Sequence, residues 1–226
     1  MEEVTVNRRV SRAPFDEVMG PWLAPDNDSF DGRALYAAKT ASDVQEPDGA
    51  LSVKVPDAVN NAFSKSLAYQ FQAGMGSVEV LQEGVQLDAL AAFACSPAGL
   101  MPRQCKIEVT VVLESNTRGC GVMLHASKDL DSAYYVRLEP LRNRLVFDSL
   151  PRPGDIPFDV GVERPITLSS HTSIDLKVFV DNTVCVVYAD DKVAMNTRLY
   201  DLKDGSWGVF VSEGSAKFRN IRISTL

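Results

Sequence analysis

Residues 173–180 (SIDLKVFV) and 183–189 (TVCVVYA), separated by Asp181 and Asn182, decide the fold of this chain of 226 residues. Both stretches are rich in β-branched and aromatic residues, which favour strands, and apolar and polar positions alternate along the first one. Asp and Asn tolerate the positive φ angles that a two-residue hairpin turn requires. The pattern therefore predicts two antiparallel strands joined by a tight turn at Asp181 and Asn182.

The same kind of signal continues on both sides of this hairpin. From Lys106 onward, strand-length stretches alternate with Gly, Pro, Asn and Asp, and helical periodicity is nearly absent. Besides the hairpin, we expect strands at residues 106–113, 121–125, 133–139, 144–148, 193–199, 208–212 and 216–223. In the last stretch the apolar residues change sides at Asn220, which predicts a β-bulge. Many short strands at regular spacing predict an all-β fold, an antiparallel β-sandwich.

The beginning of the chain has a different character. Residues 1–65 are polar and irregular, with several prolines and only short apolar runs. We expect them to form an irregular N-terminal extension that lies across a β-sandwich domain of residues 66–226. Within the extension, residues 57–63 (DAVNNAF) predict a short helix with Asp57 as its cap.

Composition restricts the classes of partner. The chain has 30 acidic and 23 basic residues and a net charge of −7, which disfavours nucleic acid and anionic membrane surfaces. No stretch approaches the roughly 20 apolar residues of a membrane-spanning helix. The N-terminus begins with Glu2 and Glu3 where a signal peptide would carry basic residues, so we expect a cytoplasmic protein.

Cysteine and histidine usage does not indicate a metal site. Cys95, Cys105, Cys120 and Cys185 fall in or beside apolar stretches and have no C-x-x-C spacing. We expect reduced thiols in the core, with a single disulfide as the alternative. The chain has only two histidines, His125 and His171, and it lacks the set of closely spaced thiolates and imidazoles that a structural zinc site needs. No metal and no cofactor is predicted.

The C-terminal half resembles the end of glycoside hydrolase family 32, which comprises invertases, levanases and inulinases that split β-fructosides. The residues that carry the resemblance are Asp181, Val184, Val187, Tyr188, Asp190, Asp191, 197–200 (TRLY) and 208–221 (GVFVSEGSAKFRNI). Val186 stands where the family usually has Glu, and Lys192 where it has Gly. The resemblance implies a concanavalin-like jelly-roll sandwich.

The N-terminal half resembles the same family in pieces. Residues 30–40 (FDGRALYAAKT) are similar to the last blade of the family's five-bladed catalytic propeller, and residues 45–56 to the strand that leads into the sandwich. A further strand and a Gly/Trp-rich loop are missing between Asp43 and Val44. The extension thus looks like a shortened remnant of the propeller.

The catalytic motifs of that family are absent. Retaining glycosidases use two carboxyl groups about 5–5.5 Å apart. The family supplies its acidic residues from W-x-N-D-P-N-G, Arg-Asp-Pro and Glu-Cys stretches, and this sequence contains none of them. The resemblance therefore implies a non-catalytic module, and hydrolysis would require a separate catalytic propeller.

Exposed aromatic residues can stack on sugar rings, and the candidates for carbohydrate contact are Trp207, Tyr188, Tyr135 and Arg198. Packing in the sandwich is the competing explanation for the aromatic residues. Trp207 follows Gly205 and Ser206 at the start of a strand, so we expect it to be the most exposed of them.

Three functional hypotheses follow from these observations. The first is a non-catalytic module that binds a fructan or sucrose-like glycan, or that packs against a propeller-bearing chain or a second copy of itself. The second is a subunit or fragment of a β-fructosidase whose catalytic part is another polypeptide. The third is a lectin-like concanavalin-type binding domain, because a shared fold does not fix function.

Overall fold

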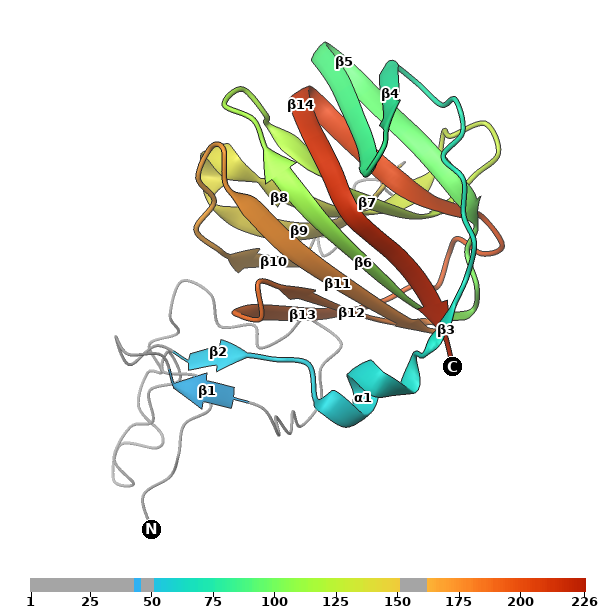
Figure 1. The fold of residues 1–226 in the computed structure, drawn as a ribbon, viewed down its shortest axis with the longest axis vertical. Coiled ribbons are helices and arrows are strands. Elements are labelled where there is room, and N and C mark those ends of the chain that lie inside the picture. Colours follow the sequence, from blue (N-terminus) through green and yellow to red (C-terminus); the bar gives the residue numbers. More distant parts are fainter. Residues whose placement is uncertain (1–42, 46–50, 151–161) are drawn as a thin grey trace, which may run out of the picture.

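A computed structural model describes residues 43–45, 51–150 and 162–226 (Figure 1). The stretch at residues 30–40 that resembles a propeller blade lies outside the described residues. Of the second stretch, residues 45–56, residues 46–50 also lie outside them. The elements are β1 (Asp43–Gln45), β2 (Leu51–Val53), α1 (Asp57–Ala62), β3 (Lys65–Ser66), β4 (Ser77–Leu81), β5 (Gly84–Leu100), β6 (Gln104–Leu113), β7 (Gly119–Ala126), β8 (Ala133–Glu139), a 3₁₀ turn (Pro140–Arg142), β9 (Arg144–Leu150), β10 (Val162–Pro165), β11 (Ser173–Asp181), β12 (Val184–Ala189), β13 (Val193–Arg198) and β14 (Ser206–Thr225).

The strands form an antiparallel sandwich whose two layers share the long strands β5 and β14 (Figure 1). The first half of β14 pairs with β7, which continues to β8, β9 and β10. The second half pairs with β6, which continues to β11, β12 and β13. The predicted all-β sandwich is confirmed.

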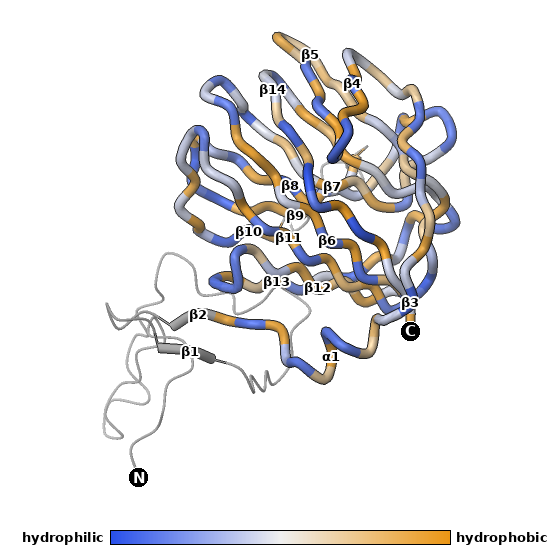
Figure 2. Tube along the Cα trace, in the orientation of Figure 1, coloured by the Kyte–Doolittle hydropathy of each residue, from blue (hydrophilic) through white to orange (hydrophobic). Residues whose placement is uncertain are grey.

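The core lies between the two layers. Figure 2 shows polar and apolar residues alternating along the strands of the sandwich. In β6, Ile107, Val109, Val111 and Leu113 are buried and the residues between them are less so. Burial of such a side chain contributes roughly 1.5–3 kcal/mol to stability. All four cysteines are free thiols, and all four are buried, as the sequence predicts.

The central hairpin is confirmed, with its turn shifted by one residue. Asp181 is still part of β11 and pairs with Val184, so the turn consists of Asn182 and Thr183. Asn182 has a φ of 54° and Thr183 is not in the left-handed region. The expectation that Asp181 is a turn residue is wrong, because the ladder with β6 holds it opposite Gln104.

The last two predicted strands are parts of one strand, whose register shifts near Gly208, at Glu213 and Gly214, and again near Asn220. β14 runs from Ser206 to Thr225, and it bends at Glu213 and Gly214, which both have positive φ. A Cβ at Gly214 would overlap the backbone of Asn116, so only glycine fits. The predicted bulge is confirmed, since Asn220 has a φ of 50° and the register shifts between Arg219 and Arg222.

The described part of the N-terminal extension packs on the outer face of the β11–β13 layer. The Val53 N–H donates to the Lys192 carbonyl. Phe63, just after α1, contacts the ring of Phe179 edge-on at 5.4 Å, and the Lys106 ammonium donates to Asn60 Oδ1 at 3.0 Å. The division at residue 65 stays a prediction.

The predicted helix is confirmed, but its cap is not Asp57. Pro56 is the N-cap, Asp57 is the first helical residue, and no side chain closes the helix end. Proline at this place pre-sets the backbone, and the Asp57 carboxylate still lies in the first turn, where it favours the helix dipole. Among the described residues, no helix is long and apolar enough to cross a membrane.

Candidate binding site at one end of the sandwich

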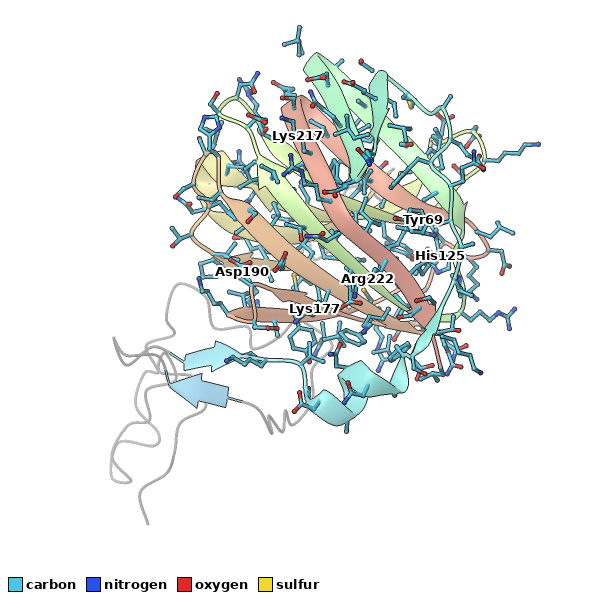
Figure 3. All side chains as sticks on the ribbon, viewed as in Figure 1. Tyr69, His125, Lys177, Asp190, Lys217 and Arg222 are labelled. Carbon is cyan, nitrogen blue, oxygen red and sulfur yellow. The ribbon has the colours of Figure 1, made fainter. Side chains whose placement is uncertain are left out.

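Two adjoining hollows open where β7 ends and β14 begins. The first cavity has a volume of about 220 Å³ and the second about 370 Å³, and Asp204 lines both. The first is lined by Arg103, His125, Asn182, Thr183, Leu199, Leu202, Lys203 and Asp204. The second is lined by Gln72, Ala73, Pro97, Gly99, Leu100, Ala126, Ser127, Lys128, Leu130, Asp204, Gly205 and Ser206. Figure 3 labels His125 on this side of the molecule and Asp190 on the opposite side.

Unusual backbone geometry gathers at the first cavity. His125, Asn182 and Asp204 have φ angles of 51°, 54° and 56°. This left-handed region is easy for Asn and Asp but costs roughly 1–2 kcal/mol for other residues. A Cβ at Gly205 would overlap the backbone carbonyl of His125, so the 199–205 loop lies directly against the end of β7. Backbone strain of this kind often accompanies functional sites.

His125 is the buried polar residue of the first cavity. Its side chain is only 8% exposed, and its Nδ1 is buried without a hydrogen-bond partner. Burial lowers the pKa of His125 below its ordinary value of 6.5, and the nearby Asp204 carboxylate opposes that shift. The imidazole is therefore neutral at pH 7, with one ring nitrogen unsatisfied. A buried polar atom without a partner is uncommon and calls for a ligand or water.

Three charged side chains of the first cavity have no ionic partner among the residues that the structure describes. Arg103, Lys203 and Asp204 are exposed, and they form none of the ion pairs found within residues 51–150 and 162–226. Their charges and hydrogen-bonding groups are free to meet a ligand.

Tyr134 holds the loop that carries two of these charges. Its hydroxyl oxygen accepts hydrogen bonds from the backbone N–H groups of Asp201 at 2.7 Å and Leu202 at 3.1 Å. Its buried ring stacks on Phe147 with a centroid separation of 5.5 Å. The loop beside the cavity is thus anchored to the core, which keeps its polar groups in position.

The structure does not bring the four predicted carbohydrate-binding residues together, and none of them lines either cavity. Trp207 is 1% exposed, so the expectation that it is the most exposed is wrong. Its indole packs edge-on against Tyr69 at 5.4 Å and tilted against Phe71 at 6.4 Å. Both rings come from the segment before β4, far from Trp207 in sequence.

Of the other three predicted residues, Tyr135 is buried, whereas Tyr188 and Arg198 share the outer face of the β12–β13 pair but lie four residues apart along it. Tyr135 is 4% exposed and its ring meets Phe210 edge-on at 4.8 Å. Tyr188 is half-buried against Phe179 on the outer face of β12. Arg198 is exposed at the end of β13, directly before Leu199 of the first cavity. Their contact with a glycan stays a prediction.

Sequence reasoning missed Arg103, Lys203 and Asp204. The one local signal is the turn composition of Lys203, Asp204 and Gly205, which marks a loop and no particular chemistry. The cavity forms from four separate stretches of chain, so only the fold brings these residues together. Within the part of the chain that the structure describes, no cluster of three His, Cys, Asp or Glu residues is suited to a metal ion.

Residues 78–225 match the family model described as "Glycosyl hydrolases family 32 C terminal". The chain belongs to this family. The match covers the strands from β4 to β14, so the resemblance inferred from the C-terminal half is confirmed. No curated protein sequence matches the chain.

Solved structures agree on the fold of this family 32 C-terminal domain. A carbohydrate-binding module, CBM66 from Bacillus subtilis, has a TM-score of 0.60 and 14% identity, covering 71% of this chain and 97% of the module. A fructosyltransferase from A. japonicus has a TM-score of 0.56 and 19% identity, covering 82% of this chain. A β-fructofuranosidase from Aspergillus kawachii has a TM-score of 0.56 and 13% identity, covering 77% of this chain. This chain spans only 31% and 30% of the length of those two enzymes.

Proposed function

We propose that this chain is a non-catalytic carbohydrate-binding module that holds a fructan or sucrose-like glycan at the two cavities. The observation that carries the proposal is the first cavity, where Arg103, Lys203 and Asp204 are exposed and form none of the ion pairs found within residues 51–150 and 162–226. Membership of the family 32 C-terminal domains supports a glycan as the ligand.

The lining has the composition that a sugar requires. A sugar presents hydroxyl groups that need converging donors and acceptors, and C–H faces that need apolar contacts. Asn182, Lys203 and Asp204 supply donors and acceptors, while Leu199 and Leu202 supply apolar surface. The adjoining second cavity gives room for a second sugar unit in contact with Pro97 and Leu130.

The lining also favours binding without hydrolysis. Retaining glycosidases need two carboxyl groups about 5–5.5 Å apart. Among the described residues that line the two cavities, Asp204 is the one carboxylate. A single carboxylate accepts hydrogen bonds from sugar hydroxyls but does not supply the acid and nucleophile of this mechanism.

Titration calorimetry with sucrose, inulin and levan oligosaccharides tests the proposal, with released fructose assayed in the same samples. We expect heat of binding and no fructose. Asp204→Asn keeps a residue that tolerates positive φ but removes the charge, and we expect it to weaken binding by about tenfold. Asp201→Asn, in the same loop but outside both cavities, is the matched control and should bind like the parent protein. Fructose release, or equal loss in both variants, would contradict the proposal.

A second candidate function is docking to another chain, either a propeller-bearing partner or a second copy. The observation that favours it is strand β4, which lies at a sheet edge and pairs only with β5. Val80 in β4 is 65% exposed and Leu90 in β5 is 86% exposed. Edge strands and exposed apolar side chains are common in interfaces. Light scattering of the purified chain, alone and with Val80→Lys, tests self-association; a monomer at all concentrations excludes the second copy.

A further inference from the structure

We infer that the glycan held in the first cavity carries an anionic group, a phosphate or a carboxylate, that lies between Arg103 and Lys203. This inference rests on the proposed function and names the class of sugar. It starts from the charges around the cavity, which are opposite in sign to those of the whole chain.

The local charge is positive in an acidic protein. The chain has 30 acidic and 23 basic residues. The first cavity has two cations, Arg103 and Lys203, and one anion, Asp204, which leaves one positive charge. The adjoining cavity adds Lys128, which likewise takes part in none of the ion pairs within the described ranges. A local surplus of positive charge favours an anionic ligand over a neutral one.

The two cations approach the cavity from different loops that are both fixed. The Arg103 carbonyl accepts a hydrogen bond from the Asn182 N–H at 2.7 Å, which ties its segment to the β11–β12 turn. Lys203 follows Leu202, whose N–H is held by the Tyr134 hydroxyl. Because both loops are anchored, less conformational entropy is lost on binding. Arg103 and Lys203 are therefore suited to bind one anionic group between them.

The side chains suit an anion better than a neutral hydroxyl. A guanidinium binds carboxylate or phosphate through two parallel hydrogen bonds, and an ammonium adds a point charge. The Asp204 carboxylate can accept hydrogen bonds from sugar hydroxyls. The anionic group of the ligand would therefore contact the two cations, and its hydroxyl groups would contact Asp204.

The size of the cavity favours one sugar unit as the carrier of the charge. Its 220 Å³ lies below the roughly 300–1,000 Å³ of pockets for larger ligands. A hexose phosphate or a uronic acid combines one ring with one anionic group.

Calorimetric titrations with fructose, fructose 6-phosphate, glucuronate and inorganic phosphate test the inference on the full chain. We expect at least one of the two anionic sugars to bind about tenfold more tightly than fructose, and the advantage to shrink as salt rises. The double variant Arg103→Gln/Lys203→Gln should remove that advantage. Lys192→Gln, an exposed lysine outside both cavities, is the matched control and should keep it.

Each other outcome has a distinct meaning. Equal affinity for fructose and both anionic sugars overturns the inference and leaves the proposed function intact. Inorganic phosphate binding as tightly as the sugar phosphate also overturns it, because the sugar would then contribute nothing. No binding of any sugar overturns the inference and the proposed function together.

Discussion

The two ends of the sandwich differ in how their charged side chains are paired. At the end opposite the cavities, Glu114 lies 3.5 Å from His171 Nδ1 and 3.6 Å from Lys217 Nζ, and Arg118 lies 3.1 Å from Glu213. At the cavity end, the charged groups of the first cavity have no ionic partner within the described ranges. The strands are the same at both ends, so the difference arises in the loops. The charged side chains of one end pair with one another, whereas those of the first cavity form no ion pair within the described ranges, as the proposed binding requires.

The largest loss of stability should come from substituting Gly205, where the 199–205 loop contacts the end of β7. Gly205→Ala would place a Cβ on the backbone carbonyl of His125, where neither partner can move away as a flexible side chain would. We expect a loss of about 3 kcal/mol in the free energy of unfolding, measured by chemical denaturation.

Gly99→Ala is the control for that substitution. Gly99 also lines the second cavity, and a Cβ there would meet nothing within 4 Å, although its φ of 140° disfavours other residues. We expect a loss of about 1 kcal/mol. Equal losses at the two glycines would mean that the contact of the 199–205 loop with β7 does not hold the cavity end together.

Removing one hydroxyl should loosen the same loop. Tyr134→Phe deletes the acceptor of the Asp201 and Leu202 N–H groups, and we expect a loss of about 1–3 kcal/mol in unfolding free energy and weaker glycan binding. Tyr135→Phe is the matched control in the next residue, since no hydrogen bond of the Tyr135 hydroxyl is found within the described ranges. A loss of stability in both variants, or neither, would show that the loop does not depend on Tyr134.

The sequence predicts features that depend on neighbouring residues and misses those that depend on tertiary contacts. The β11–β12 hairpin and the bulge at Asn220 follow from local alternation and turn chemistry, so they were predicted almost to the residue. β5 was not assigned as a strand, because residues 89–94 (ALAAFA) contain no β-branched residue and the strand exists by pairing with β14. Trp207 is buried by Tyr69 and Phe71, and the cavity joins Arg103 to Lys203. Both depend on tertiary contacts that no local pattern contains.

His125 offers a pH test of the open end. The pKa of His125 is lowered by burial, so the unfolded chain takes up a proton at a higher pH than the folded chain does. Stability from this group is complete above about pH 6.5 and falls as the pH drops from there to the lower pKa of the folded state. We expect His125→Asn to flatten that part of the stability curve. An unaltered curve in His125→Asn would contradict a neutral buried imidazole.

The smallest effect should come from breaking an ion pair at the closed end. Arg118 and Glu213 are well exposed, and exposed pairs contribute only about 0.2–1 kcal/mol because water and salt screen them. Glu213→Gln should therefore lower the unfolding free energy by about 0.5 kcal/mol or less, with the loss vanishing in high salt. Arg103→Gln, which breaks no pair within the described ranges, should leave stability unchanged while it weakens binding of an anionic sugar. If Glu213→Gln and Arg103→Gln had the same effects on stability and on sugar binding, the two ends of the sandwich would not differ in their ion pairs. The proposal that Arg103 binds an anionic sugar would then fail.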